Sequence, residues 1–431
     1  MSASKHRWFI VAVFFMFMLI HQADKLVIGS LAPDIMDTFK ITKTQMGLVT
    51  TGALIVGAVF YPIWGYLYDR YARPKLLALA SLIWGATTWL NAIAPTYPIF
   101  LGTRATTGVD DSSYPGLYSL ISDYFGPTVR GKIYGLLQLT GPIGYLGGMI
   151  FAMTLSGPFG WRGIFYITGS IGLVLAVVIF FGVRDAPRGR VEPELAGVEQ
   201  LHTYRFNWQT ARELFKKRSL LLLFVQGFFG VFPWTTITYW IITYLQEERG
   251  YSDGAIQLTM TLAIVVLALG YPLGGAMGDW LFKRTPRGRA IVSAIAVLTG
   301  AILLFFTLNI PVANQGLFMV MLAATALFIP FAGPNVVSIV YDITLPEVRS
   351  TAMSIQYFIE SAGAALAPTI AGAIADAKGS SLRIAFLVIC ISTWLLCAIF
   401  FAAVAKLVPG DIATLHQQLE ERAAYEQARQ S

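Results

Sequence analysis

The sequence predicts an all-α membrane protein in which twelve transmembrane helices form two pseudo-symmetric six-helix bundles. Of the 431 residues, 56% are hydrophobic and only 13% are charged, whereas about a quarter of the residues of a soluble domain are charged. Apolar runs long enough to cross a bilayer recur along the whole chain. In addition, short motifs of the first half return at corresponding positions in the second half, as expected for a membrane protein built from a repeated unit.

The apolar runs divide six and six around one long polar interruption. The first run, from Trp8, has no small-residue cleavage site before its polar break at His21, so it is predicted to be a membrane helix rather than a signal peptide. The predicted spans are 8–37, 46–68, 75–94, 98–123, 131–154, 162–183, 219–245, 254–279, 290–309, 314–341, 350–375 and 383–406. The predicted domains are an N-terminal bundle (1–183), a cytoplasmic linker (184–218), a C-terminal bundle (219–406) and a cytoplasmic tail (407–431).

Lysine and arginine fix the expected orientation, with both termini in the cytoplasm of an inner or plasma membrane. In this orientation roughly 23 of these residues lie in cytoplasmic segments and roughly six lie outside, as the positive-inside rule requires. The net charge of +7 therefore follows from topology and needs no nucleic-acid partner. In the linker, NWQTARELFKKR (207–218) is amphipathic and is predicted to be an interfacial helix rather than a simple tether.

The fourth run carries the most unusual residues of the chain, because Arg104, Asp110 and Asp111 lie inside a segment of membrane-spanning length. A charge at this depth costs a few kcal/mol or more, so such residues normally face a protein interior or a water-filled cavity. On a continuous helix Arg104 and Asp111 share one face, and Asp110 points about a third of a turn away. They are expected either to line a transport path or only to bind this helix to its neighbours.

Depth along the helices indicates which charges meet. Asp24 lies 16 residues after Trp8, about 24 Å from the inner face, and Arg104 lies about 9 Å below the outer face. In a core of about 30 Å plus some interface these depths roughly coincide, so Asp24 and Arg104 are predicted to pair. Asp111 is then left without an obvious cation and becomes the candidate proton carrier. Lys25 can instead satisfy one of these acids.

Further candidates for the substrate or proton path are polar or aromatic residues in other spans. His21 lies one turn before Lys25 and is either a proton relay or a packing group. Glu360 is a second intramembrane acid, with a direct role or a packing role. The remaining candidates, each of which alone is more often a helix-packing residue, are Gln138, Tyr145, Trp234, Tyr239, Trp240 and Asn335.

Several classes of site are excluded or disfavoured. The two cysteines, Cys390 and Cys397, lie seven residues apart in one apolar run and are expected to pack between helices. The chain has no CxxC motif or His/Cys cluster, so no structural metal is predicted, and no cofactor is expected. It also has no GxxxxGK[ST] loop, which an ATP-driven pump would need.

The repeated loops carry a resemblance to a known family. GYLYDRYARPK (65–75) corresponds to GGAMGDWLFKRTPRGR (274–289), and PTVRGKIYG (127–135) corresponds to PEVRSTAMS (346–354). These loops resemble the signature of the major facilitator superfamily, and GLLQLTGPIGYLGG (135–148) resembles its glycine–proline motif. The residues that carry the loop resemblance are Gly65, Asp69, Arg70, Arg73 and Lys75, then Gly274, Gly278, Asp279 and Arg284, with Ala72 and Pro74 as departures.

Two branches of the superfamily fit the first half. TRATTGVDDSSY (103–114), with Asp24 and Lys25, resembles the spinster-type lipid transporters. Tyr114-Pro115-Gly116 resembles the organic anion:cation symporters. Asp110 and Asp111 stand where these branches have glycine and glutamate, so the subfamily stays open.

The resemblance implies a monomeric secondary transporter, not an enzyme, that moves a small organic anion or an amphipathic lipid-like molecule by alternating access. The predicted helices 1, 4, 7 and 10 would line the cavity. Arg104 would attract the anionic end of the substrate or hold Asp24, and Asp111 or Asp24 would carry the coupling proton. Another coupling ion, a uniporter and a non-transporting receptor on the same fold remain alternatives.

The same resemblance assigns the loop motifs to the cytoplasmic gate. Asp69 is expected next to the N-terminus of the eleventh helix, and Asp279 next to that of the fifth, because a helix N-terminus favours a carboxylate. Arg130 and Arg349 stand at the corresponding starts of these two helices.

Overall fold

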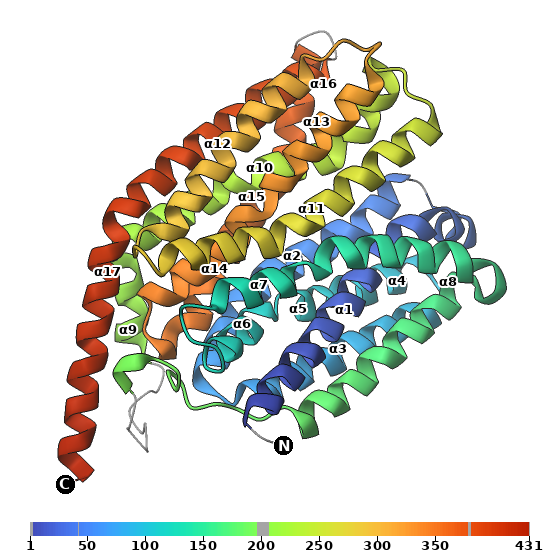
Figure 1. The fold of residues 1–431 in the computed structure, drawn as a ribbon. Coiled ribbons are helices and arrows are strands. Elements are labelled where there is room, and N and C mark those ends of the chain that lie inside the picture. The colour runs from blue at the N-terminus through green and yellow to red at the C-terminus, as the bar shows by residue number, and fades with distance from the viewer. Residues whose placement is uncertain (1–2, 42, 196–206, 378–380, 431) are drawn as a thin grey trace. The chain divides into compact units, whose positions relative to one another are not determined.

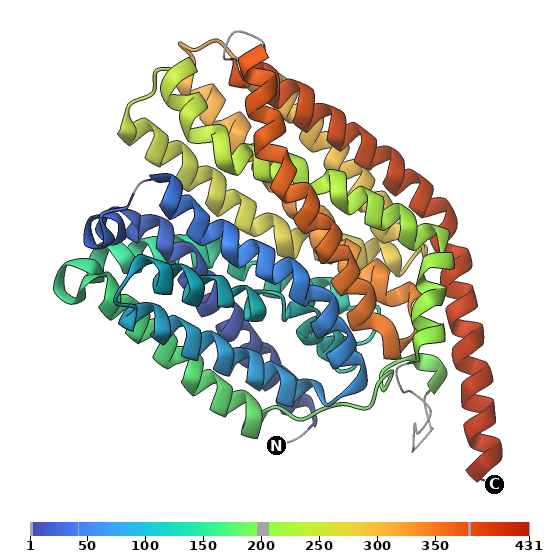
Figure 2. The same cartoon turned by 180° about the vertical axis from the view of Figure 1, so that it is seen from behind.

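The computed structural model describes residues 3–41, 43–195, 207–377 and 381–430, and all regular elements in these ranges are helical (Figures 1 and 2). The chain forms two compact units. Unit 1 comprises residues 1–125, 139–207 and 346–355, and unit 2 comprises residues 126–138, 208–345 and 356–431. Each unit therefore takes in a short segment from the other half of the sequence. The domain boundaries given by the apolar runs remain predictions.

The helices of unit 1 are α1 (Ala3–Phe39), α2 (Lys43–Arg70), α3 (Arg73–Ile93), α4 (Tyr97–Thr106), α5 (Gly108–Asp111), α6 (Tyr114–Ser122) and α8 (Thr140–Gly182), with the first turns of α15 (Arg349–Ala377). The helices of unit 2 are α7 (Arg130–Gln138), α9 (Trp208–Glu213), α10 (Arg218–Thr243), α11 (Asp253–Phe282), α12 (Gly288–Leu308), α13 (Gln315–Phe328), α14 (Ala332–Ile343), the rest of α15, α16 (Leu382–Phe386) and α17 (Ser392–Gln430). Short 3-10 or π turns join or extend several of them, at Pro193–Leu195, Leu214–Lys216, Tyr244–Glu248, Ile329–Phe331, Pro346–Val348 and Leu387–Ile391.

Ten helical stretches of the described residues are long and apolar enough to cross a membrane. The two further predicted spans, 98–123 and 131–154, are also helical but interrupted. The first is divided among α4, α5 and α6, and the second passes from α7 into α8 at Leu139.

The break of the fourth span corrects the expectation of one continuous helix. Backbone that leaves the helix at membrane depth is tolerated only where it is buried in protein and its polar groups find partners. Here Thr107, Ser112 and Ser113 are buried. The hydroxyl of Thr107 donates to the carbonyl of Arg104 at 2.7 Å, and that of Ser112 to the carbonyl of Val109 at 2.9 Å.

A glycine makes the turn between the fifth and sixth predicted spans, which α8 contains as one element. Gly160 has φ 64° and ψ 170° inside α8, a conformation that costs glycine little and other residues much. Pro158 lies two residues earlier and cannot donate a helical hydrogen bond. The chain therefore reverses here without a long loop.

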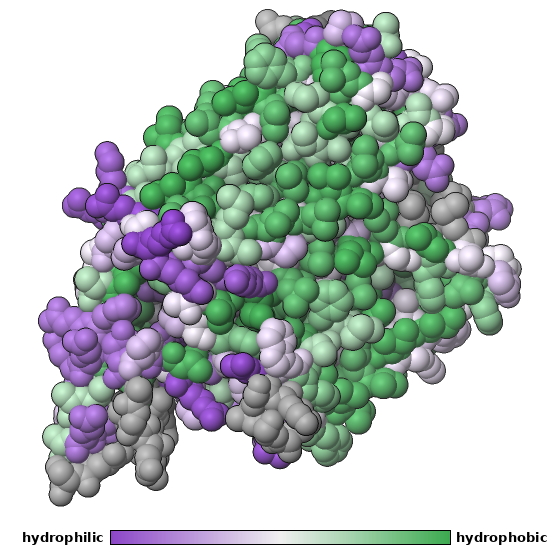
Figure 3. Space-filling view, in the orientation of Figure 1, coloured by the Kyte–Doolittle hydropathy of each residue, from purple (hydrophilic) through white to green (hydrophobic). Residues whose placement is uncertain are grey.

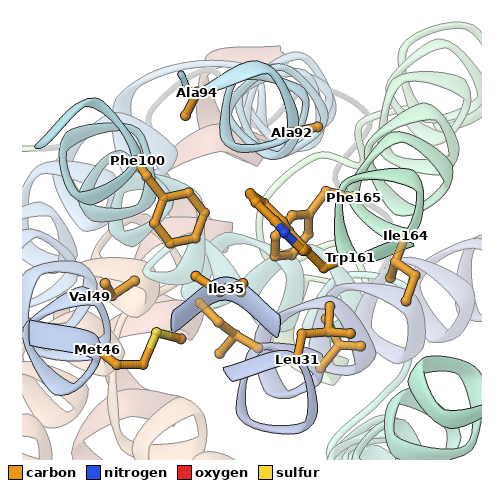
Figure 4. Packing of buried hydrophobic residues seen from close by; sticks show 12 residues of the cluster. Leu31, Ile35, Met46, Val49, Ala92, Ala94, Phe100, Trp161, Ile164 and Phe165 are labelled. Carbon is orange, nitrogen blue, oxygen red and sulfur yellow. The ribbon is translucent and has the colours of Figure 1, made fainter. Parts of the chain in front are cut away.

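One hydrophobic core of unit 1 lies between α1, α2, α3, α4 and α8 (Figure 4). The rings of Phe100 and Trp161 face each other edge-on at 5.6 Å in its centre, a contact worth about 0.5–1.5 kcal/mol beyond its buried area. Because lipid is as apolar as these side chains, such packing contacts, rather than the hydrophobic effect alone, hold membrane helices together. This core fixes α4 against α1 and so sets the position of the polar residues on both.

The surface agrees with a membrane protein. In Figure 3 hydrophobic residues cover the faces of the helices, and hydrophilic residues gather towards their ends. The predicted amphipathic piece of the linker is helical over Trp208–Glu213, with Trp208 and Phe215 exposed and Leu214 buried. Its position at a membrane surface remains a prediction. The last predicted span passes through α16 and a π turn into α17, which continues to Gln430.

Candidate functional site

Polar and charged side chains from α1, α4 and α5 meet inside unit 1. We call them the intramembrane cluster, and its members are His21, Asp24, Lys25, Arg104, Asp110 and Asp111. The sequence predicted these six residues as candidates, and the structure brings them together. Three acids and three basic groups form four contacts in this cluster, which are described acid by acid.

Asp24 is held by many partners. A guanidinium nitrogen of Arg104 lies 3.7 Å from its carboxylate, which is the pairing predicted from helix depth. The hydroxyl of Thr168 donates to the same carboxylate at 2.5 Å, and the indole of Trp84 and hydroxyl of Thr88 donate at 3.1 and 3.3 Å. Asp24 and Arg104 are both buried. The carboxylate of Asp24 thus has a cation and three hydrogen-bond donors as partners, an arrangement that suits a structural role.

Asp111 is paired with Lys25, and the prediction that it lacks a cation is wrong. The ammonium of Lys25 lies 3.0 Å from one carboxylate oxygen, and the other oxygen lies 3.3 Å from Nε2 of His21. The alternative that Lys25 satisfies an acid is the one that the structure supports. Lys25 keeps 37% of its side chain exposed, so it is the accessible cation of the cluster.

Asp110, which the sequence placed off the shared face, is the acid without a permanent cation. It is fully buried, and its carboxylate lies 2.7 Å from Nε2 of His21. Nδ1 of His21 lies 2.6 Å from the hydroxyl of Tyr114, which also accepts from the amide of Gln22 at 3.2 Å. With Nε2–H donating to Asp110, the neutral ring accepts from Tyr114. Phe17 stacks on the ring at 5.6 Å and holds its plane.

The charges of the cluster do not balance while His21 is neutral. Asp24 with Arg104 and Asp111 with Lys25 are two neutral pairs, and Asp110 adds one negative charge. An uncompensated charge in the membrane is costly. One proton, on either His21 or Asp110, would remove the imbalance. The arrangement is therefore chemically suited to bind a single proton.

The same residues lie close enough for a small cation, because one ligand atom each of His21, Asp110 and Asp111 lies within 4.8 Å of the others. The Lys25 ammonium beside Asp111 opposes a further positive ion there by charge repulsion. A proton needs only one acceptor atom rather than a set of ligands, and the His21–Asp110 contact offers one.

Both loop carboxylates cap helices as predicted. Asp69 accepts from the backbone amides of Ser350 and Thr351 at 3.1 and 2.7 Å, at the start of α15. Its nearest guanidinium belongs to Arg188 of the linker, at 4.0 Å. Burial lowers the pKa of the Arg188 guanidinium from its ordinary value. A Cβ at Gly65 would lie 2.6 Å from the hydroxyl of Ser354, so glycine permits this close approach of α2 and α15.

The second cap, in unit 2, is more strongly paired. Asp279 accepts from the amides of Gly131 and Lys132 at 3.1 and 2.9 Å, at the start of α7. Arg289 lies 2.8 Å from Asp279 and also forms a salt bridge with Asp342. The helix N-terminus and a buried guanidinium thus both stabilise the negative charge of Asp279.

The arginines of the loop motifs fall into two groups. Arg73 is buried against Asp123 and Asp185, with the latter contact at 2.9 Å, and Arg349 lies 2.6 Å from Glu192. Arg130 lies 3.6 Å from Asp342. In contrast, Arg70 and Arg284 are exposed and lie over the rings of Tyr66 and Trp280 at 5.7 and 4.0 Å.

The remaining predicted residues lie elsewhere. Asn335 donates to the carbonyls of Gly274 and Phe331 at 3.0 and 2.8 Å, and a Cβ at Gly278 would lie 1.7 Å from its side chain, so it packs α14 on α11. Glu360 accepts from the amide of Gln356 at 2.7 Å. Gln138 belongs to unit 2, where it lies against Gly333. Tyr145, Trp234 and Tyr239 are exposed, and Trp240 donates to the carbonyl of Pro368 at 3.0 Å.

Sequence reasoning missed several members of these sites. The donors to Asp24 from α3 and α8 are a tryptophan and two threonines in apolar runs, and nothing in their local pattern marks them. The linker residues Arg188 and Glu192 follow the last apolar run of the first half, where only the charge pattern APRGR signals them. Arg289 is the last residue of the repeat 274–289, so the loop comparison could have identified it.

Comparison with known proteins identifies the family of this chain. The family model described as Major Facilitator Superfamily matches residues 13–314. Protein spinster of Drosophila melanogaster is 28% identical over 396 residues, covering 87% of this chain, and the aligned region spans 63% of the length of that relative. The hexuronate transporter of Bacillus subtilis is 23% identical over 388 residues, covering 88% of this chain and 90% of that protein.

Two solved structures share the fold. A bacterial homolog to human lysosomal transporter Spinster, inward-facing and unoccupied, has a TM-score of 0.58 and 19% identity and covers 98% of both chains. The E. coli fucose:proton symporter FucP has a TM-score of 0.70 and 14% identity and covers 92% of this chain and 98% of its own. The helical fold, the loop motifs and the matched model lead to one conclusion: the chain belongs to the major facilitator superfamily and is an integral membrane transporter of the secondary type.

Proposed function

We propose that the protein is a proton-coupled symporter of a small organic anion, and that the His21–Asp110 contact binds the coupling proton. The proposal rests on Asp110, the one acid of the cluster that pairs with histidine and with neither lysine nor arginine. Asp110 is fully buried 2.7 Å from His21, whereas Asp24 and Asp111 each have a cation. A histidine beside a buried carboxylate is a suitable place for a coupling proton, because histidine is the side chain whose charge ordinarily changes near neutral pH.

The geometry supports a link between anion binding and proton binding. Lys25 is the exposed cation of the cluster, so an incoming carboxylate or sulfonate would compete with Asp111 for its ammonium. Asp111 would then lose its cation while still 3.3 Å from His21. A protonated His21 compensates that charge, so the substrate anion and the proton stabilise each other's binding.

The exposed ammonium of Lys25 favours an anionic substrate, and the names of some relatives support the same class. The names of the relatives include a hexuronate transporter and, in Cupriavidus necator, a probable sulfoacetate transporter, both for anions. An amphipathic lipid-like substrate, implied by the resemblance of residues 103–114 to the spinster-type lipid transporters, is the second candidate. A thermal-shift screen over carboxylates, sulfonates and lysolipids distinguishes the two. Stabilisation by lysolipids alone would contradict the organic-anion assignment.

Transport itself is tested in proteoliposomes with an imposed pH gradient, with glucuronate as the first probe and any stabilising anion from the screen as the second. Asp110→Asn imitates the protonated carboxyl, so exchange of substrate across the membrane should persist while uphill accumulation is lost. Gln22→Ala, which removes only a donor to Tyr114, is the matched control and should still accumulate substrate. Uphill accumulation of substrate by the Asp110→Asn protein would exclude the proposed proton site. Equal uptake by the wild type with and without the pH gradient would indicate a uniporter.

We also propose that both termini face the cytoplasm, because lysine and arginine crowd the corresponding segments. Cys390 and Cys397 are buried, so replacing both with serine gives a background for labelling. A cysteine introduced at Ser252 should react with an impermeant reagent added outside, and one at Arg190 should not. The reverse pattern would overturn the orientation.

A further inference from the structure

A basic cavity of about 710 Å³ lies in unit 1, at the start of α1 and the end of α8. Three arginines line it, Arg7, Arg184 and Arg190. The start of α1 and the end of α8 lie side by side in both ribbon views (Figures 1 and 2). This cavity plays no part in the intramembrane cluster or in the helix caps.

The arginines of this cavity have no acidic partner. Among the described residues, no carboxylate lies within 4.0 Å of any of the three guanidinium groups. The two acids that line the cavity, Asp123 and Asp185, are both engaged by Arg73. The cavity therefore carries an excess of positive charge that its own acids do not neutralise.

Two buried nitrogen atoms in the cavity wall also lack a partner among the described residues. They are Nε of Arg7 and Nε2 of His6. A buried polar atom without a hydrogen bond is uncommon in a folded protein and calls for an explanation. The hydroxyl of Tyr124, also in the wall, donates to the carbonyl of Arg184 at 2.9 Å and fixes that segment. An oxyanion in the cavity would give these donors a partner.

The rim of the cavity is apolar and faces outward. Phe181 lines the cavity and is 80% exposed, and its neighbour Phe180 is also exposed. Trp8 is exposed near the start of α1. Exposed aromatic side chains beside basic ones are typical of the level where lipid headgroups meet acyl chains. A free anion in water would gain nothing from this rim.

From these observations we propose that the cavity binds the phosphate headgroup of an anionic membrane lipid. The guanidinium groups would donate charge-assisted hydrogen bonds to the phosphate oxygens, and Phe180 and Phe181 would contact the acyl chains. Basic pockets between membrane helices are known to bind such headgroups. This site does not depend on the substrate or coupling ion proposed above.

The test measures the affinity of the purified protein for short-chain phosphatidylglycerol, by thermal shift in a zwitterionic detergent at constant ionic strength. Short-chain phosphatidylcholine and inorganic phosphate are the comparison ligands. The double variant R184Q/R190Q removes two exposed arginines, and R212Q/K216Q removes the same charge from exposed positions of unit 2. At about fivefold per surface arginine, the first variant should raise the apparent Kd for phosphatidylglycerol roughly 25-fold.

The wild type and R212Q/K216Q should bind phosphatidylglycerol alike, and phosphatidylcholine should stabilise neither. Equal stabilisation by both lipids, or equal affinities of the two variants, would overturn the site. Stabilisation by inorganic phosphate as strong as by phosphatidylglycerol would show a free-anion site and contradict the lipid assignment. If R184Q/R190Q does not purify, R184K/R190K keeps the charge and should retain most of the affinity; loss of binding by this purified variant would also count against the proposal.

Discussion

The two units treat ionisable groups inside the membrane differently. In unit 1, the intramembrane cluster gives each of three acids a basic partner, and one of these partners is histidine. In unit 2, Glu360 accepts from Gln356 and has no cation within ion-pair distance among the described residues. Because an unpaired charge is costly at membrane depth, we expect Glu360 to be neutral. We therefore expect unit 1 to bind the substrate anion and the proton. We expect Glu360 of unit 2 to contribute only a hydrogen bond in its neutral form.

The largest effect in this comparison is expected from Arg104→Ala. It leaves Asp24 buried without its cation, a loss of about 3–5 kcal/mol, so the purified yield and the melting temperature should fall sharply. Asp24→Asn combined with Arg104→Ala removes both charges and should recover much of that loss. If the double variant is no more stable than Arg104→Ala, the pair does not stabilise the fold through its charges.

The two helix caps give a prediction of intermediate size. Asp279→Asn removes a carboxylate from both a helix N-terminus and Arg289, and should cost about 1–3 kcal/mol. Asp69→Asn loses mainly the attraction of its helix N-terminus, about 0.3–1 kcal/mol and up to about 2 where partly buried. Hydrogen exchange at residues 131–132 and 350–351 measures each cap locally. Faster exchange in Asp69→Asn than in Asp279→Asn would reverse the order that the contacts predict.

The smallest effect is expected from Glu360→Gln. If Glu360 is neutral, the amide has nearly the same shape and keeps the hydrogen bond to Gln356, so stability should change by less than about 0.5 kcal/mol. Melting temperature and proton-driven uptake are the measurements. A loss of accumulation in this variant would assign Glu360 a part in coupling and remove the contrast between the units.

Much of this contrast was predictable from sequence. The apolar runs and the lysine and arginine bias predict the helical membrane fold, and comparison of loops predicts the caps of Asp69 and Asp279. Depth along two helices predicts the Asp24–Arg104 pair, because the rise per residue is nearly constant.

The assignment of the proton carrier was not predictable in the same way. It depends on how α1 packs on α5, because His21 contacts both Asp110 and Asp111 and Lys25 pairs with Asp111 alone. Hydropathy does not show which of the two acids receives the lysine. The partners of Asp24 on α3 and α8 likewise depend on tertiary packing.

The central claim is that the His21–Asp110 contact takes up a proton when the anion binds. The most direct test is to mix substrate with the purified protein in weakly buffered solution near neutral pH and to follow a pH indicator. For the wild type we predict uptake of up to about one proton for each protein molecule that binds substrate. Glu360→Gln should take up the same amount. Asp110→Asn should still bind substrate but take up no proton. Equal proton uptake by Asp110→Asn and the wild type would contradict the account.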